Sequence, residues 1–195
     1  KKYYNRNSIV IHPPVDISRF TPATKRGDHY VTIGRQLPYK RYDLAVTAAT
    51  KLGKKLIVFG NGPAHSRLVD LAGPTVEFRT DRFGDASDAE YEKAITTARG
   101  FIYPAEEDFG IVSVEALAAG APVIGLARGG TTDIVTSPEV GVLFDRQTSI
   151  SVAKAIEQAE KRTFDPTILR RTAQRFDKTL FLTKLRKVVR DQIIK

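Results

Sequence analysis

The sequence predicts an α/β fold, a Rossmann-like doubly wound parallel sheet of about six strands with helices on both faces. Short apolar runs alternate with helical stretches along the chain, which is typical of βαβ units. Within the runs, apolar residues follow one another without polar alternation, as they do in strands that are buried on both faces. Several runs end at a glycine or proline, where a strand would turn toward its helix.

The predicted elements follow from these patterns in order. We expect strands at residues 29–33, 55–59, 76–78, 101–103, 122–126 and 141–144. We expect helices at residues 42–51, 87–98, 111–119 and 149–161, and another with Pro63 in its first turn. Ser87 and Glu90 have capping-box spacing, so Ser87 is the predicted N-cap of its helix.

The chain divides into three predicted parts. Residues 1–26 form a connector with a short apolar strand at 8–11, stiffened by Pro13 and Pro14. Residues 27–162 form the Rossmann-like domain, and residues 163–195 form basic C-terminal helices. With 195 residues, the chain is long enough to bury a substantial core.

Composition narrows the classes of function. The chain has no Cys, which excludes disulfides and thiol chemistry, and its three scattered His do not predict a structural zinc site. No apolar run is long enough to span a bilayer, and no signal peptide is visible. Because the sequence contains no Met, we expect that it starts inside a longer gene product or was trimmed.

Positive charge is concentrated at the C-terminal end of the chain. Residues 161–195 hold eleven Lys or Arg and three Asp, so they carry +8 of the net charge of +9. This distribution favours an anionic surface, such as lipid headgroups or an acidic domain, over nucleic acid as a partner. An apolar stripe runs through the same tail at helical spacing: Phe181, Leu185, Val188, Val189 and Ile193. We favour a helix packed on the core, with a membrane-surface helix as the alternative.

The loop after the fourth predicted strand carries the richest set of functional groups. Gly110 stands where a helix should begin, so the amides of residues 110–112 would be unpaired donors that attract phosphate. Glu107 precedes the helix and Glu115 lies in its second turn, where both carboxylates could accept hydrogen bonds from sugar hydroxyls. Taken alone, Glu107 and Asp108 could be simple partners of the helix dipole.

The loop after the first predicted strand complements this site. Gly34 is followed by Arg35 and Lys40, two cations that suit a diphosphate, although each alone is more often a surface charge. Gly60 begins a Gly-x-Gly turn after the second strand. The first strand is not followed by Gly-x-Gly-x-x-Gly, which counts against a dinucleotide dehydrogenase, and no Walker A sequence is present.

These segments together resemble the retaining family-4 glycosyltransferases of the GT-B fold, and specifically their C-terminal, donor-binding domain. The resemblance covers nearly the whole chain. Its segments are 12–16, which resembles the interdomain connector, 34–41, 60–63, 129–130, and 107–115 followed by Ala-Leu-Ala-Ala-Gly-Ala-Pro-Val-Ile.

The resemblance implies roles for individual residues. Arg35 and Lys40 would contact the donor diphosphate, together with the backbone of Ile111 and Val112. The sugar hydroxyls would be held by Glu107 and by the amides near Phe109 and Gly110, and the ribose hydroxyls by Glu115. We therefore expect Glu107, Arg35 and Lys40 to be catalytic, and the remaining substrate-binding residues to be Asp108, Phe109, Gly110, Ile111, Val112, Glu115, Gly34 and Gly60.

The resemblance also has implications for cofactors, for the partner domain and for the location of the full protein. No metal or cofactor is expected, because Arg, Lys and a helix N-terminus stabilise the departing nucleoside diphosphate. The family's candidate catalytic His belongs to an N-terminal acceptor-binding domain that this chain lacks, and we interpret His12, His29 and His65 as structural or surface residues. The chain alone is expected to be inactive. The full protein is expected in the cytoplasm, with peripheral contact at the inner face of the cell membrane as a further possibility.

Two departures from the family pattern limit the expected specificity. Thr132 and Asp133 stand where Pro and Glu are common, and residues 79–83 replace a Gly-bearing loop near the base. The sequence of residues 106–110 is similar to that of mannosyltransferases that use GDP-mannose. We thus expect transfer of a hexose, with mannose as the specific candidate, to a glycan or lipid-linked acceptor in polysaccharide or lipopolysaccharide biosynthesis. The alternatives are a sugar-nucleotide epimerase and a non-catalytic nucleotide or nucleic-acid binding module.

Overall fold

A six-stranded parallel sheet forms the centre of the molecule. The structure, a computed structural model, describes residue 5, residues 7–80 and residues 86–193. The strands are β1 (His29–Ile33), β2 (Lys55–Phe59), β3 (Val76–Arg79), β4 (Gly100–Tyr103), β5 (Val123–Leu126) and β6 (Gly141–Phe144), in the order β3-β2-β1-β4-β5-β6. The predicted fold class is confirmed.

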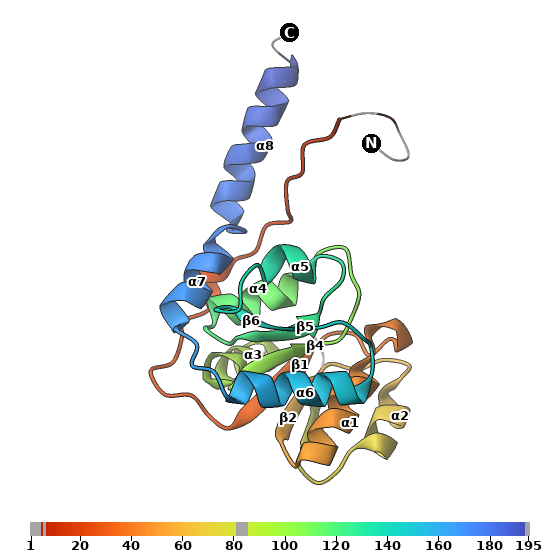
Figure 1. Cartoon of the computed structure of the whole chain (residues 1–195). Coiled ribbons are helices and arrows are strands. Elements are labelled where there is room, and N and C mark those ends of the chain that lie inside the picture. Colours follow the sequence, from red (N-terminus) through yellow and green to blue (C-terminus); the bar gives the residue numbers. More distant parts are fainter. Residues whose placement is uncertain (1–4, 6, 81–85, 194–195) are drawn as a thin grey trace.

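Helices cover both faces of the sheet (Figure 1). One apolar layer involves α1 (Tyr42–Leu52), α2 (His65–Leu71) and α6 (Ser149–Glu160). The other involves α3 (Ala86–Thr97), α4 (Ile111–Ala118), α5 (Thr131–Ile134) and α7 (Pro166–Gln174). Two single turns of 3-10 helix, η1 (Ile17–Arg19) and η2 (Pro38–Lys40), lie in the connections. The strands are apolar throughout because side chains of both orientations are buried, as Phe101 and Ile102 in β4 illustrate.

The strand order places a crevice above the carboxyl ends of β1 and β4. These two strands pair in parallel, but β1 is followed by β2 on one side and β4 by β5 on the other. Loops at such a reversal diverge and leave room for a ligand. The helix that follows β4 is α4, and its far end is fixed because Arg26 donates to the Ala119 carbonyl at 3.3 Å and Arg170 donates to the Ala118 carbonyl at 3.2 Å. Guanidinium groups suit the negative end of a helix.

Three local predictions are wrong. Residues 8–11 form no strand: Ile9 and Val10 are 69% and 73% exposed, and no described strand pairs with them. Ser87 lies inside α3, which begins at Ala86, so it is not the N-cap. Pro63 precedes α2, which begins only at His65 after the N-cap Ala64.

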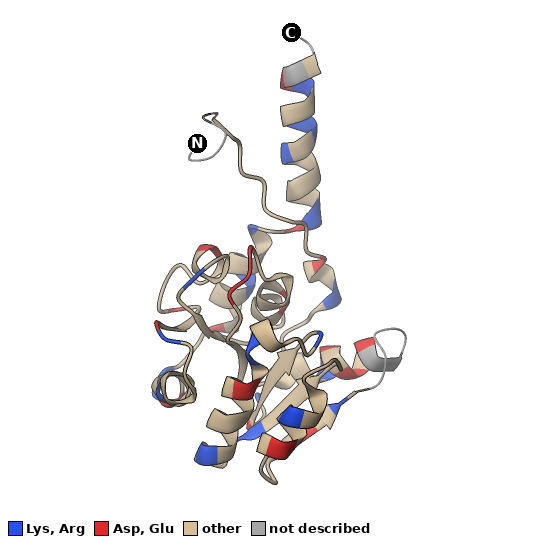
Figure 2. Cartoon of the chain, turned by 90° about the vertical axis from the view of Figure 1, so that its right-hand side faces the viewer, with Lys and Arg blue, Asp and Glu red and all other residues tan. Residues whose placement is uncertain are grey.

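The last helix, α8 (Lys178–Ile193), extends away from the domain beside the arm of residues 7–14 (Figure 1). It begins where Val15 forms a bridge with Asp177 and Lys178 pairs with Asp16 at 2.5 Å. The expected packing of its apolar stripe on the core is wrong, since Val189 and Ile193 are 46% and 75% exposed. Figure 2 shows Lys and Arg along this helix. None of the described helices is both long and apolar enough to cross a membrane.

Candidate functional site

The N-terminus of α4 opens onto a pocket at the crevice. Gly110 is its N-cap and has a left-handed backbone, with φ of 92°, which favours glycine. The structure shows no side-chain cap at this end, so the amides of the first turn remain available to an anion. Residues 110–112 line a pocket of about 560 Å³, together with residues of the β1–α1 loop. The predicted anion-binding turn therefore faces a cavity.

Glu107 and Lys40 form an ion pair across this pocket. Lys40 ends η2, and its Nζ lies 2.8 Å from Glu107 Oε1. Both side chains are largely buried, with 17% and 21% of their surface exposed, and both residues line the pocket. The β1 and β4 loops thus bring together two of the predicted catalytic residues.

Two tyrosine hydroxyls also contact Glu107. Tyr39 donates to Oε1 at 3.3 Å, and Tyr103, at the end of β4, donates to Oε2. Burial disfavours the charged form of Glu107, but the hydrogen bonds from Lys40 and Tyr103 outweigh it and hold the pKa of Glu107 below its usual value. Burial, followed by the bond to Glu107, raises the pKa of Tyr103, so this hydroxyl remains a donor at neutral pH.

The paired glycines brace the loop that carries Glu107. The amide of Gly130 donates to the Glu107 carbonyl at 2.8 Å. A Cβ on Gly130 would lie 2.2 Å from Phe109 Cα, and one on Gly129 would lie 2.3 Å from the Glu107 carbonyl oxygen. Two residues without side chains are therefore needed for this close approach. Gly129, Gly130 and Asp133 line a second pocket of about 680 Å³, which shares Tyr39 and Glu107 with the first.

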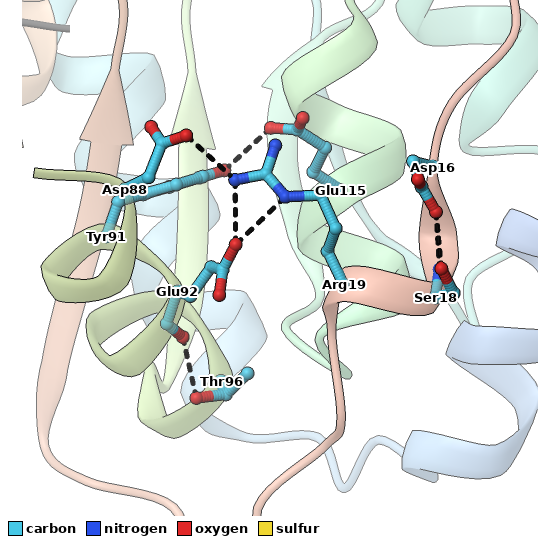
Figure 3. A network of polar contacts seen from close by, with 8 residues as sticks. All are labelled: Asp16, Ser18, Arg19, Asp88, Tyr91, Glu92, Thr96 and Glu115. Carbon is cyan, nitrogen blue, oxygen red and sulfur yellow. Dashed lines mark hydrogen bonds and ion pairs between the residues drawn. The ribbon is translucent and has the colours of Figure 1, made fainter. Parts of the chain in front are cut away.

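Glu115 lies in the second turn of α4, half-buried and outside the lining of these two pockets as described. Its Oε2 accepts a hydrogen bond from the Tyr91 hydroxyl at 3.1 Å. Figure 3 shows it beside the Arg19 guanidinium, which pairs with Asp88 and Glu92 of α3. Burial raises the pKa of Glu115, and the Tyr91 hydrogen bond opposes this effect. The carboxylate is thus in polar surroundings rather than in packed hydrocarbon.

The remaining predicted residues differ in their placement. Gly34, Asp108 and Phe109 line the first pocket, and Phe109 stacks on His12 with ring centroids 5.4 Å apart. Gly60 is buried, and its carbonyl accepts a bond from the Gln36 side chain at 2.6 Å. Arg35 is exposed, and it is not among the described residues that line either of the two pockets.

The sequence analysis missed the tyrosines. Tyr39 adjoins Lys40, and Tyr103 ends a predicted strand, so position at the sheet edge was an available signal for both. Tyr91 had no such signal, because its contact with Glu115 depends on how α3 packs against α4. The described residues contain no group of three or more His, Asp or Glu placed to hold a metal ion.

The chain is similar in sequence and in fold to known glycosyltransferases and to a synthase. A D-inositol 3-phosphate glycosyltransferase from Salinispora arenicola is 30% identical over 172 residues, which cover 70% of this chain and 38% of that protein. A sucrose-phosphate synthase from Thermosynechococcus elongatus has the same fold, with a TM-score of 0.74 and 22% identity over 94% of this chain and 52% of that one. A pneumococcal O-GlcNAc transferase solved with UDP and GlcNAc has a TM-score of 0.71 and 19% identity over 93% of this chain and 38% of its own.

The chain thus spans between about two fifths and one half of the length of these proteins. The family model for "Glycosyl transferases group 1" matches residues 16–177, which include the whole sheet and both loops of the pocket. On this match, the chain belongs to the glycosyl transferases group 1 family.

Proposed function

We propose that this chain holds the nucleotide diphosphate sugar donor of a retaining glycosyltransferase, and that the whole protein transfers a hexose to a glycan or lipid-linked acceptor. The observation that carries the proposal is the pocket in which the uncapped start of α4 faces the Lys40–Glu107 pair. Free amides and an ammonium stabilise the negative charge that develops on a departing nucleoside diphosphate. A carboxylate beside them can accept hydrogen bonds from the hydroxyls of the transferred sugar.

The Lys40–Glu107 pair supports separate binding roles for its two residues within the pocket. Without donor, each charge neutralises the other, so neither is buried unpaired. When a diphosphate contacts Lys40, the hydroxyls of Tyr39 and Tyr103 can still donate to Glu107 and hold its carboxylate toward the sugar. We assign diphosphate binding to Lys40 and the backbone of Ile111 and Val112, and sugar binding to Glu107 and Gly110. The assignment of Arg35 to the diphosphate rests on the family resemblance alone.

The proposal also names a specific donor. The sequence of residues 106–110 favours GDP-mannose. The relative cited above is named for transfer to D-inositol 3-phosphate, and one structural neighbour was solved with UDP, so uridine donors are the natural comparison. We therefore propose mannose as the hexose, with GDP-mannose to be tested against UDP-glucose and ADP-glucose.

Calorimetric titration of the chain with GDP, UDP and ADP, and then with these sugar nucleotides, tests both the donor site and the identity of the donor. We expect at least one diphosphate to bind and Lys40→Ala to weaken it about tenfold, because a charge-assisted contact to phosphate is lost. Lys55→Ala is the matched control: Lys55 pairs with Asp28 at 2.7 Å at the opposite, amino end of the strands, so its loss should leave affinity unchanged. If no diphosphate binds, or if both variants lose affinity equally, the proposed donor site is refuted. Tighter binding of UDP-glucose than of GDP-mannose would refute only the mannose assignment.

A further inference from the structure

We propose that Tyr91 is a positioning residue for nucleotide binding: its buried hydroxyl orients the Glu115 carboxylate so that the carboxylate's remaining acceptor sites meet the ribose hydroxyls of the donor. This inference rests on the proposed function, because it requires a bound nucleotide and the ribose role that the family resemblance implies for Glu115. It adds a residue from α3, an element that the donor-site assignments do not otherwise use.

The Tyr91 ring is held rigidly in the core. It is 4% exposed and packs edge-on against Phe20 and Phe59, with ring centroids 6.2 and 5.6 Å away. Aromatic packing on two sides leaves the ring little freedom to rotate away. The hydroxyl is therefore presented to Glu115 Oε2 at a fixed place, 3.1 Å away.

Glu115 needs such a partner because its side chain is half-buried on a short helix. A carboxylate has acceptor sites on two oxygens, and one phenolic donor occupies a single site. The bond from Tyr91 thus fixes the orientation of the group while leaving other sites for a pair of neighbouring hydroxyls. Burial raises the pKa of Tyr91 well above its ordinary value, so the hydroxyl keeps its proton across the neutral range.

Arg19 completes the support from the side of the connector. Its guanidinium binds Glu92 through Nε at 2.9 Å and Nη2 at 2.7 Å, and reaches Asp88 at 3.1 Å. These contacts tie η1 to the helix that carries Tyr91, as Figure 3 shows. Arg19 uses its Nε and Nη2 for these contacts with α3, and the direct hydrogen bond to Glu115 among the residues drawn comes from Tyr91.

The experiment compares a nucleotide with its dideoxy analogue. We would titrate the chain with GDP, UDP and ADP, take the tightest binder, and repeat with the corresponding 2′,3′-dideoxynucleoside diphosphate. Tyr91→Phe should weaken the ribonucleotide roughly fivefold, the usual effect of one lost hydrogen bond, and leave the dideoxy analogue unchanged. A merely structural role would weaken both ligands alike, and that result, or no effect on either, would overturn the inference.

Two further variants separate an effect that acts through Glu115 from the general effect of removing a buried tyrosine hydroxyl. Tyr30→Phe removes another buried tyrosine hydroxyl that donates to a glutamate, Glu160, at 3.2 Å, but on the other face of the sheet; it should change neither affinity. In a Glu115→Gln background, Tyr91→Phe should lose its effect on the ribonucleotide, and an undiminished effect would contradict action through Glu115. If Glu115→Gln weakens the ribonucleotide but Tyr91→Phe does not, only this inference fails. If the unaltered chain binds none of the three diphosphates, the proposed function fails and this inference fails with it.

Discussion

At the scale of single residues, Glu107 is the point where separate segments meet. Tyr39 and Lys40 reach it from η2, Tyr103 reaches it from the end of β4, and Gly130 holds its carbonyl from the β5–α5 turn. A carboxylate with this many fixed donors is oriented before any ligand arrives. Preorganisation of this kind lowers the cost of binding and of stabilising charge during reaction.

Gly130→Ala tests how tightly the Glu107 loop is braced. The Gly130 backbone is helical, with φ of −62°, so alanine adds no torsional strain, but its Cβ would lie 2.2 Å from Phe109 Cα. We expect a loss of about 1–3 kcal/mol in the free energy of unfolding, measured by urea titration, and weaker nucleotide binding.

Gly53→Ala is the control for that variant. Gly53 is the C-cap of α1 with φ of 62°, and a Cβ there meets no atom within 4 Å. It should cost about 1 kcal/mol through backbone strain and leave nucleotide affinity intact. A Gly130→Ala chain that is as stable as the unaltered one and binds as well would show that the loop tolerates displacement.

The sequence allowed a prediction of some of these residues and not of others. Gly110 and Glu107 are recognisable because they are close in sequence and lie where a strand gives way to a helix. Lys40 could be placed at the same edge because parallel strands end together. The Tyr91–Glu115 bond and the contact of Gly130 with Phe109 join residues more than twenty positions apart, and only packing determines such pairs.

At the scale of elements, the two C-terminal helices behave differently. In α7, Leu169 and Ala173 are fully buried, and the helix belongs to the same apolar cluster as α4. In α8, the apolar positions remain substantially exposed. Helical spacing of apolar residues predicted an amphipathic helix at residues 181–193, but periodicity does not reveal what covers the apolar face. This is why the expectation of core packing was wrong.

Removing residues 182–195 tests this difference. Leu182, Leu185 and Val189 are 44%, 39% and 46% exposed, so we expect the melting temperature of the shortened chain to stay within about 2 °C of the original. Leu169→Ala in α7 should instead cost about 2–5 kcal/mol, because it opens a cavity in the core. A large loss of stability on shortening would mean that α8 is bound to the domain after all.

At the scale of the whole molecule, the order of strands determines where a ligand can bind. Alternation of apolar runs and helices was enough to predict a parallel sheet of six strands, and that prediction is confirmed. The order β3-β2-β1-β4-β5-β6 was not derivable from spacing alone, because it depends on which way each helix crosses the sheet. That order places the β1 and β4 loops at one crevice and so brings Lys40 to Glu107.

The central claim is that a nucleoside diphosphate lies against the start of α4. A crystal structure of this chain with the tightest-binding diphosphate tests it most directly. We predict phosphate oxygens within hydrogen-bonding distance of the Ile111 and Val112 amides and of Lys40 Nζ, with the ribose beside Glu115. A diphosphate bound elsewhere, with the α4 amides and Lys40 out of its reach, would contradict the account.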